Sequence, residues 1–280
     1  MRSFRWIVSA LLSLAAPTLA QSDMRGASPA SPLVMGETFT IQSRTLDETR
    51  RINVYLPPIY KDSATVRLPV LYMPDGGMGE DFLHVAGLVQ VSVGNGTMRP
   101  FILVGIENTE RRRDLTGPTR NAEDRKIAPH VGESAAFRKF IRTELMPVVD
   151  ARYRTTKETA IVGESLAGLF IVETFFLEPD LFDTYIAIDP SLWWNDHALV
   201  DSAAARLRIG GTDKHTLFLA NSSQDIDQLT KVLADTLARY AQDNLTWYYQ
   251  PMPGEQHATI YHPAALIAFR RVLEPEPTSH

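Results

Sequence analysis

The 280-residue sequence predicts one α/β domain with a mostly parallel central sheet, an N-terminal antiparallel hairpin and flanking helices. Short apolar runs of strand length alternate with segments of helical periodicity, which is the pattern of parallel strands joined by helices. Near the start, two alternating segments are separated by a polar turn, as in a hairpin. Apolar residues make up 44% of the chain and charged residues 22%, which excludes collagen, coiled coils and wholesale disorder.

The hairpin is predicted from two neighbouring segments. Phe39–Leu46 alternates imperfectly between apolar and polar residues, and Ile52–Leu56 alternates cleanly. The polar stretch Asp47–Arg50 between them has the composition of a turn. We therefore expect these segments to pair as antiparallel strands.

Short apolar runs that end in turn residues follow the hairpin. Both faces of such a run are hydrophobic, which suits a strand buried on both sides of a parallel sheet. The predicted strands are Val70–Met73, Phe101–Val104, Thr159–Val162, Tyr185–Ile188, Thr216–Leu219 and Thr246–Tyr249.

Helical periodicity lies between and after these runs. Apolar residues recur at helical spacing in Ser134–Val149, where Pro147 is a candidate disruption, and in Ile226–Tyr240. A final helix fits Pro263–Leu273, with proline in its first turn. The stretch Ser191–Gly211 lacks a clean strand, so we expect an excursion over the sheet.

The N-terminal segment has the pattern of a secretory signal peptide. Arg2 and Arg5 precede an apolar run from Trp6 to Ala16, and a cleavage site fits after Ala20. The alternative is a membrane anchor, but the run is too short to span a bilayer comfortably. We therefore expect a periplasmic or secreted protein with no stable membrane anchor after cleavage. The predicted organisation is a signal peptide at 1–20, a flexible lead-in at 21–33, a single domain at 34–274 and a tail at 275–280.

Charge and cysteine content narrow the function classes. With 28 basic and 33 acidic residues the chain has a net charge of −5, which argues against broad nucleic-acid binding. The absence of cysteine excludes disulfides, thiolate metal sites and a cysteine nucleophile. No histidine-rich spacing indicates a metal, so we expect neither metal nor cofactor. An enzyme or a small-ligand binder remains.

A candidate nucleophile lies where the predicted strand Thr159–Val162 turns into an apolar helix. Gly163, Ser165 and Ala167 form the pattern small–x–Ser–x–small, which places the hydroxyl on a sharp turn at the carboxyl edge of the sheet. The usual pattern has glycine at the position of Ala167. The alternative is an ordinary strand-to-helix turn with a capping serine, but the flanking strand and helix favour a catalytic serine.

These motifs resemble the putative-esterase branch of the α/β-hydrolases, which includes esterase D and the enterochelin (siderophore) esterases. The matching segments run in order through nearly the whole chain after the predicted signal peptide. They are Leu71–Gly76, Ile106–Thr116, Gly163–Phe170, Glu178–Phe182, Ala187–Trp194 and Pro253–His257. The resemblance implies an α/β-hydrolase fold and a serine nucleophile at Ser165.

The resemblance also implies a base and an acid, in the chain order serine, acid, histidine. His257 follows the last predicted strand and is the expected base, with His262 as its main rival. Asp225 falls nearest the family's acid position, but two other residues also qualify. These are Asp227, which equally suits the first turn of a helix, and Asp189, which follows the preceding strand. Some siderophore esterases work with a serine–histidine pair alone, so an acid need not be present.

Backbone N–H groups are the expected oxyanion donors. Leu166 contributes the first helical N–H after the nucleophile. By resemblance the second donor is Gly77, with Met78 next, and the alternative is an ordinary glycine turn.

Arginine and tryptophan residues are the candidates for substrate contact. Arg111–Arg113 follow a strand at the carboxyl edge, where ligands of open α/β sheets bind, and Arg113 lies beside the active site in the resembling family. The alternative is a solvated loop in which nearby carboxylates neutralise the arginines. Trp193 and Trp194 are candidate walls for an aromatic group, although they equally suit burial in the core.

Together these features predict an exported serine esterase that hydrolyses carboxylic esters through an acyl-enzyme. Its expected substrate is a small-molecule ester with anionic or aromatic character. The resemblance favours a siderophore trilactone of the ferric-enterobactin type, whose negative charge would suit the arginines. The alternatives are an esterase for sugar-linked or small acyl esters, a prolyl-oligopeptidase-like peptidase, an acyltransferase, and a non-catalytic binding protein on a hydrolase scaffold.

Overall fold

The computed structural model describes residues 28–209 and 213–275, and the chain divides into two units after Val34. The predicted signal peptide, the first residues of the lead-in and residues 276–280 of the tail lie outside the described residues. The unit from Met35 onward contains all the described helices and strands. None of these helices has the length and hydrophobicity needed to span a bilayer.

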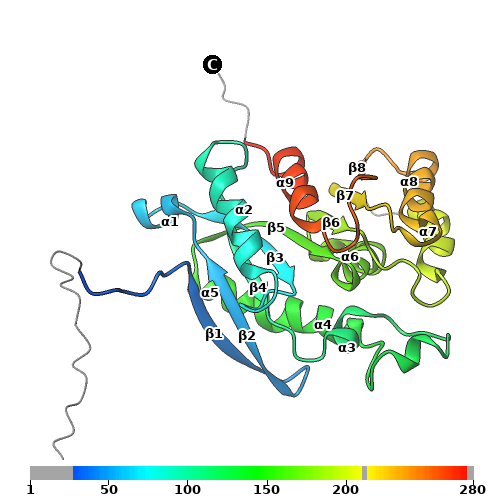
Figure 1. The fold of residues 1–280 in the computed structure, drawn as a ribbon, viewed down its shortest axis with the longest axis horizontal. Helices are drawn as coiled ribbons and strands as arrows, with labels where there is room; N and C mark the ends of the chain where they lie inside the picture. The colour runs from blue at the N-terminus through cyan, green and yellow to red at the C-terminus, as the bar shows by residue number, and fades with distance from the viewer. Residues whose placement is uncertain (1–27, 210–212, 276–280) are drawn as a thin grey trace, which may run out of the picture. The chain divides into compact units, whose positions relative to one another are not determined.

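A mixed sheet, eight-stranded within the described residues, forms the centre of this unit (Figure 1). Along the sheet the strands are β1 (Glu37–Ser43), β2 (Glu48–Tyr55), β4 (Ile102–Ile106), β3 (Leu68–Pro74), β5 (Thr155–Glu164), β6 (Thr184–Ile188), β7 (His215–Asn221) and β8 (Leu245–Pro251). The hairpin β1–β2 is antiparallel, as predicted, and β2 is antiparallel to β4. All pairs from β4 to β8 are parallel, which confirms the predicted fold class.

The helices lie on both faces of the sheet. They are α1 (Pro58–Asp62), α2 (Phe82–Gly94), α3 (Arg111–Leu115), α4 (Ser134–Phe140), α5 (Met146–Arg152), α6 (Leu166–Leu177), α7 (Ala198–Ile209), α8 (Leu229–Tyr240) and α9 (Tyr261–Val272), with short 3-10 turns at Asp124–Lys126, Pro179–Leu181 and Ile226–Gln228. Figure 1 shows α2 and α9 side by side on one face. The helices α4, α6 and α8 pack on the other.

Side-chain alternation along the buried strands produces the two halves of the core. Leu71 and Met73 of β3 face α2 and α9, whereas Val70 and Tyr72 face the opposite layer. Every residue of β3 is buried, which is why its apolar run does not alternate with polar residues.

Three segments differ in detail from the predictions. The turn of the hairpin lies at residues 44–47 rather than 47–50, because Glu48, Thr49 and Arg50 belong to β2. The helix expected at 134–149 continues through a π-helical turn, Ile141–Leu145, in which the Met146 N–H donates to the Ile141 carbonyl. This wider turn accommodates Pro147, which has no N–H to donate and crowds the preceding turn of a regular helix. The excursion expected at 191–211 contains helix α7, which packs against α8.

The register of the sheet brings loops that are distant in sequence to one edge. Glu164 pairs with Ile188, and Ile188 pairs with Ala220 on the next strand. The residues that directly follow β5, β6 and β7 therefore meet at the carboxyl edge, where open α/β sheets bind ligands.

Candidate active site

Ser165 occupies a strained turn between β5 and α6. Its backbone has φ 62° and ψ −120°, a conformation that costs a non-glycine residue about 1–3 kcal/mol. The Ser165 N–H donates to the Ile188 carbonyl at 3.0 Å, and the Ser165 carbonyl accepts from the N–H groups of Leu169 and Ser191. These three hydrogen bonds hold the turn so that the hydroxyl projects beyond the sheet edge.

Close packing around this turn explains the small residues of the motif. A Cβ atom at Gly163 would lie 2.6 Å from the Ala167 methyl group, and one at Gly168 would lie 3.0 Å from the Ile188 carbonyl oxygen. Ala167 is inside α6 and fully buried, so it needs no positive φ. The departure from glycine at this position is therefore compatible with the turn.

His257 faces the hydroxyl from the loop between β8 and α9. Its Nε2 lies 3.0 Å from Ser165 Oγ, and its backbone N–H donates to Gln224 Oε1 at 2.9 Å. The structure thus brings the two residues together as the sequence predicted. His262, the rival, lies at the start of α9, where its ring contacts that of His84 at a tilt of 40°.

Asp189, rather than Asp225, holds the imidazole. Its Oδ2 lies 2.6 Å from His257 Nδ1, and the carboxylate also accepts from the N–H and the hydroxyl of Ser222, each at 2.8 Å. Burial acts to raise the pKa of Asp189, but the hydrogen bonds from His257 and Ser222 outweigh it and the pKa falls below its ordinary value. The carboxylate therefore stays ionised beside the ring.

The expectation for Asp225 is corrected because its carboxylate binds Thr230, whereas the two ring nitrogens of His257 face Asp189 and Ser165. The Asp225 carboxylate accepts from the N–H and the hydroxyl of Thr230 in the first turn of α8, where a carboxylate satisfies free helical N–H groups. Burial raises the pKa of Asp225. Asp227 is exposed with φ 50° in the turn before α8.

Glu164 brings a second carboxylate to the imidazole, which the sequence analysis missed. Its Oε1 lies 3.2 Å from His257 Nε2, and its side chain is only 17% exposed. Burial raises the pKa of Glu164 to about 7, while His257 and Arg111 oppose this rise. The hydrogen bond to Asp189 raises the pKa of His257, burial lowers it, and the charge of Glu164 raises it further.

The same three side chains form a candidate cation site among the described residues. Glu164, Asp189 and His257 place ligand atoms within 4.8 Å of one another. However, both ring nitrogens of His257 already face hydrogen-bond partners. A cation here would compete with Ser165 for the imidazole.

The predicted oxyanion donors have different surroundings. Among the described residues, the Leu166 N–H has no hydrogen-bond acceptor, as the prediction requires. The Gly77 N–H instead donates to Glu80 Oε2 at 2.6 Å, so this group does not match the expected role. The neighbouring Met78 N–H donates to none of the described residues, which makes it the better candidate for the second donor.

Of the two tryptophans predicted to contact the substrate, only one lines the cavity beside Ser165. Trp193 lines a cavity of about 240 Å³ that also contains Ser165 and His257. Trp194 is instead only 4% exposed, and its Nε1 donates to the Gly117 carbonyl at 2.8 Å. Trp194 is therefore a core residue rather than a pocket wall.

Arg113 likewise does not match its predicted role. Its guanidinium forms ion pairs with Glu48, Glu110 and Asp114, and its side chain is 11% exposed. Arg111 binds both oxygens of Asp75, at 2.7 and 2.8 Å. Carboxylates of the fold thus neutralise two of the three arginines.

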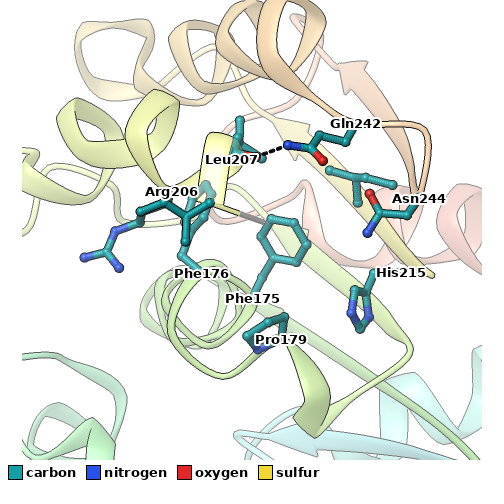
Figure 2. A pocket seen from close by; sticks show the side chains of 10 residues that line it. Phe175, Phe176, Pro179, Arg206, Leu207, His215, Gln242 and Asn244 are labelled. Atoms are coloured by element: carbon teal, nitrogen blue, oxygen red, sulfur yellow. Dashed lines mark hydrogen bonds between the residues drawn. The ribbon is translucent and has the colours of Figure 1, made fainter. Parts of the chain in front are cut away.

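A second cavity, of about 190 Å³, lies at the opposite edge of the sheet (Figure 2). Its walls include Phe175 and Phe176 at the end of α6 and His215 at the start of β7. Gln242 closes part of it by donating to the Leu207 carbonyl at 3.1 Å. Because Ser165 follows the carboxyl end of β5, this cavity is remote from the serine–histidine pair.

Comparison with known proteins identifies relatives of this chain. A family model described as "Putative esterase" matches residues 43–258. The ferri-bacillibactin esterase of Bacillus subtilis is 24% identical over 258 residues, covering 82% of this chain and 87% of the relative. The siderophore triacetylfusarinine C esterase of Aspergillus fumigatus is 32% identical over 195 residues, covering 62% of each chain.

Solved structures share the fold. An IroE-like serine hydrolase from Shewanella oneidensis superposes with a TM-score of 0.77 at 28% identity, covering 85% of this chain and 80% of that one. The enterobactin esterase of Shigella flexneri, crystallised in the presence of enterobactin, gives a TM-score of 0.66 at 17% identity. That alignment covers 86% of this chain and 60% of the esterase, and it demonstrates likeness of fold alone.

Proposed function

Because this chain belongs to the putative-esterase family of α/β-hydrolases, we propose that it hydrolyses ester bonds of siderophores through a serine acyl-enzyme. The family and the siderophore esterases among its relatives support an ester hydrolase. The arrangement of Ser165, His257 and Asp189 carries the proposed mechanism. The three residues come from loops after β5, β8 and β6, and their hydrogen bonds form one continuous chain.

In the acylation step, Ser165 Oγ attacks the ester carbonyl carbon while His257 Nε2 takes the hydroxyl proton. Asp189 accepts a hydrogen bond from Nδ1, which fixes the tautomer and stabilises the imidazolium that forms. The N–H groups of Leu166 and Met78 are the proposed donors to the tetrahedral oxyanion. A single donor of this kind typically contributes a factor of about 10²–10³ to kcat.

The imidazolium then donates this proton to the oxygen of the leaving alcohol as the ester C–O bond breaks, and the acyl group remains on Ser165. In the deacylation step His257 takes a proton from water, whose oxygen attacks the acyl carbonyl. Collapse of the second tetrahedral species releases the acid and returns the proton to Ser165. His257 therefore alternates between base and acid, which its contact with both Ser165 and Asp189 permits.

The proposed substrate class comes from the relatives, and the cavity beside Ser165 is compatible with it. Trp193, Ile226 and Leu229 supply an apolar wall next to the nucleophile, so a bulky siderophore ester could place one arm there. We further propose that the protein is exported, on the signal-peptide pattern of residues 1–20. Export would bring the enzyme to siderophores outside the cytoplasm.

Active-site labelling with a fluorophosphonate tests the mechanism. We expect one adduct on Ser165, found by peptide mapping, and none in Ser165→Ala. Ser191→Ala is the matched control, because Ser191 Oγ lies 3.4 Å from Ser165 Oγ and is the neighbouring hydroxyl. Labelling of Ser165→Ala, or full ester hydrolysis by that variant, would exclude the mechanism.

A panel of substrates tests the reaction class. We expect turnover of iron-loaded siderophore esters and of p-nitrophenyl esters, and slower cleavage of matched amides. Amide cleavage at comparable rates would indicate a peptidase, and transfer of the acyl group to added alcohols in preference to water would indicate an acyltransferase. A protein that is neither labelled nor active would be a binding protein on a hydrolase scaffold.

A further inference from the structure

The cavity beside Ser165 combines apolar walls with an acidic lining. Pro190, Leu192, Trp193, Ile226 and Leu229 supply the apolar surface. Apart from His257, the ionisable side chains of the lining are two carboxylates, Asp189 and Asp225, and none of its described residues is lysine or arginine. A charged group that enters this cavity therefore meets no side-chain cation except a protonated His257.

The surroundings on the other side of the nucleophile add to the negative charge. Glu164 directly precedes Ser165 in the chain. Burial is the main cause that raises the pKa of Glu164, and the nearby carboxylates of Asp189 and Asp75 raise it further. Arg111 is the cation of this group, but both oxygens of Asp75 bind its guanidinium. Arg111 thus pairs directly with Asp75, while its charge also acts on Glu164, and His257 contacts both Glu164 and Asp189. Around the nucleophile the carboxylates still outnumber the one permanently charged cation.

The remaining arginines of the loop after β4 do not change this balance. The ion pairs of Arg113 with Glu48 and Asp114 lie in the interior. Arg112 is exposed and forms no ion pair with a described residue, but it does not line the cavity. Carboxylates of the fold therefore hold Arg111 and Arg113, and none of the three arginines expected to attract an anionic substrate lines the cavity.

We propose that this cavity selects uncharged or cationic groups of the ester and rejects anionic ones. This inference rests on the proposed function, because it names the substrate class of the same site. An anionic group in the cavity would lie close to Asp225 and Asp189 in a partly desolvated space, where like charges repel more strongly than in water. The siderophore esters that fit are uncharged ferric trihydroxamates rather than anionic ferric tricatecholates.

Two matched sets of esters test the selectivity of the wild-type protein. The first varies the acid: methyl pentanoate, monomethyl succinate and methyl 4-(trimethylammonio)butyrate. The second varies the alcohol, with butyrate esters of propanol, glycolate and choline. In a pH-stat at low salt, we expect kcat/KM to be about tenfold or more lower for the anionic member of at least one set, with added salt narrowing the gap. An anionic ester turned over as well as its uncharged partner in both sets would overturn the inference.

The variant Asp225→Asn tests whether the charge of Asp225 causes the discrimination against anionic esters. Asparagine keeps an oxygen that can accept from Thr230 and removes one charge from the cavity wall. We expect the ratio of kcat/KM for the anionic ester to that for the uncharged ester to rise about three- to tenfold. Asp227→Asn is the matched control, because Asp227 is exposed, lies outside the lining and has the positive φ that asparagine tolerates. Equal ratios in both variants would refute a role for the lining charge.

Ferric siderophores complete the test. We expect an uncharged ferric trihydroxamate ester to be hydrolysed faster than a ferric tricatecholate trilactone under the same conditions. The reverse order, with fluorophosphonate labelling of Ser165 intact, would overturn this inference and leave the proposed function in place. Absence of labelling and of all ester hydrolysis would instead overturn the proposed function itself.

Discussion

Replacing Glu164 by glutamine should shift the pH dependence of catalysis. The Glu164 carboxylate lies 3.2 Å from His257 Nε2, the nitrogen that must be unprotonated to take the proton of Ser165. An ionised Glu164 stabilises the protonated ring and so raises the pKa of His257, in addition to the effect of Asp189. Glutamine has nearly the same shape but carries no charge. The substitution therefore isolates the charge from the packing.

The contact distance sets the size of the expected shift. Two unit charges about 4 Å apart attract by about 1 kcal/mol in water and about 4 kcal/mol at an effective dielectric constant of 20. The His257 side chain is 45% exposed, so solvent screening places the interaction near the lower figure. One pKa unit corresponds to 1.36 kcal/mol, and a Glu164 pKa of about 7 leaves this carboxylate only partly ionised across the acid limb. We therefore expect the pKa of His257 to fall by at most about one unit in Glu164→Gln.

The sign of the effect follows from the protonation state that catalysis needs. Activity requires the neutral ring and is lost as the pH falls through the pKa of His257. A lower pKa in the variant moves this acid limb to lower pH, so Glu164→Gln retains more of its own maximal activity in mild acid. Its maximal kcat should also fall by roughly two- to fivefold, because the imidazolium formed during acylation has lost one stabilising charge.

The assay is kcat/KM for an uncharged ester as a function of pH. Glu255→Gln is the matched control, since Glu255 precedes His257 in the same loop but accepts from the Thr259 hydroxyl. We expect its acid limb to move by less than half as much. An unchanged limb in Glu164→Gln, or a limb displaced to higher pH, would refute the reasoning.

Further predictions concern the catalytic acid, the cavity beside Ser165 and the strand-to-helix turn that carries Ser165. Asp189→Asn should lower kcat by about 10³–10⁴-fold through loss of the correct tautomer, whereas Asp225→Asn should lower it by less than about tenfold; equal losses would contradict the assignment. Trp193→Ala should raise KM for aromatic esters with little change in Tm. In contrast, Trp194→Ala should destabilise the fold by about 3–5 kcal/mol in thermal unfolding, because the ring is buried and hydrogen-bonded. Gly163→Ala should cost about 1–3 kcal/mol in urea unfolding, since its methyl group would clash with Ala167.

The sequence was sufficient for the fold class and for the contact between Ser165 and His257. Parallel strands buried on both faces leave apolar runs such as Val70–Met73, and these signals are local. The sequence signal for the strained turn at Ser165 is also local, because the small residues that it requires lie within a few positions of the serine. His257 could be predicted since the loop after the last parallel strand returns to the same sheet edge.

The acid could not be chosen from the sequence because the order of strands in the sheet is not local information. Asp189 and Asp225 both follow parallel strands. Only the pairing of β5 with β6 places the loop of Asp189 next to Ser165. Glu164 was missed for a related reason, since its contact with His257 depends on how a distant loop folds over β5.

Arg113 and Trp194 were wrongly predicted to contact the substrate because the sequence does not show the direction of their side chains. Consecutive residues of a loop or short helix point to different sides, so Trp193 lines the cavity while Trp194 is buried. Arg113 is likewise drawn inward by Glu48, a residue of the distant strand β2. Such choices depend on tertiary packing that no single motif encodes.

Direct detection of the acyl-enzyme tests the central claim most sharply. In a rapid-quench experiment with a slowly deacylating ester, intact-mass analysis should find one acyl group per chain, formed at least as fast as turnover. Peptide mapping should place this group on Ser165, and Ser165→Ala should form no adduct and lose hydrolysis. An adduct on another residue, or hydrolysis that persists in Ser165→Ala, would contradict the account.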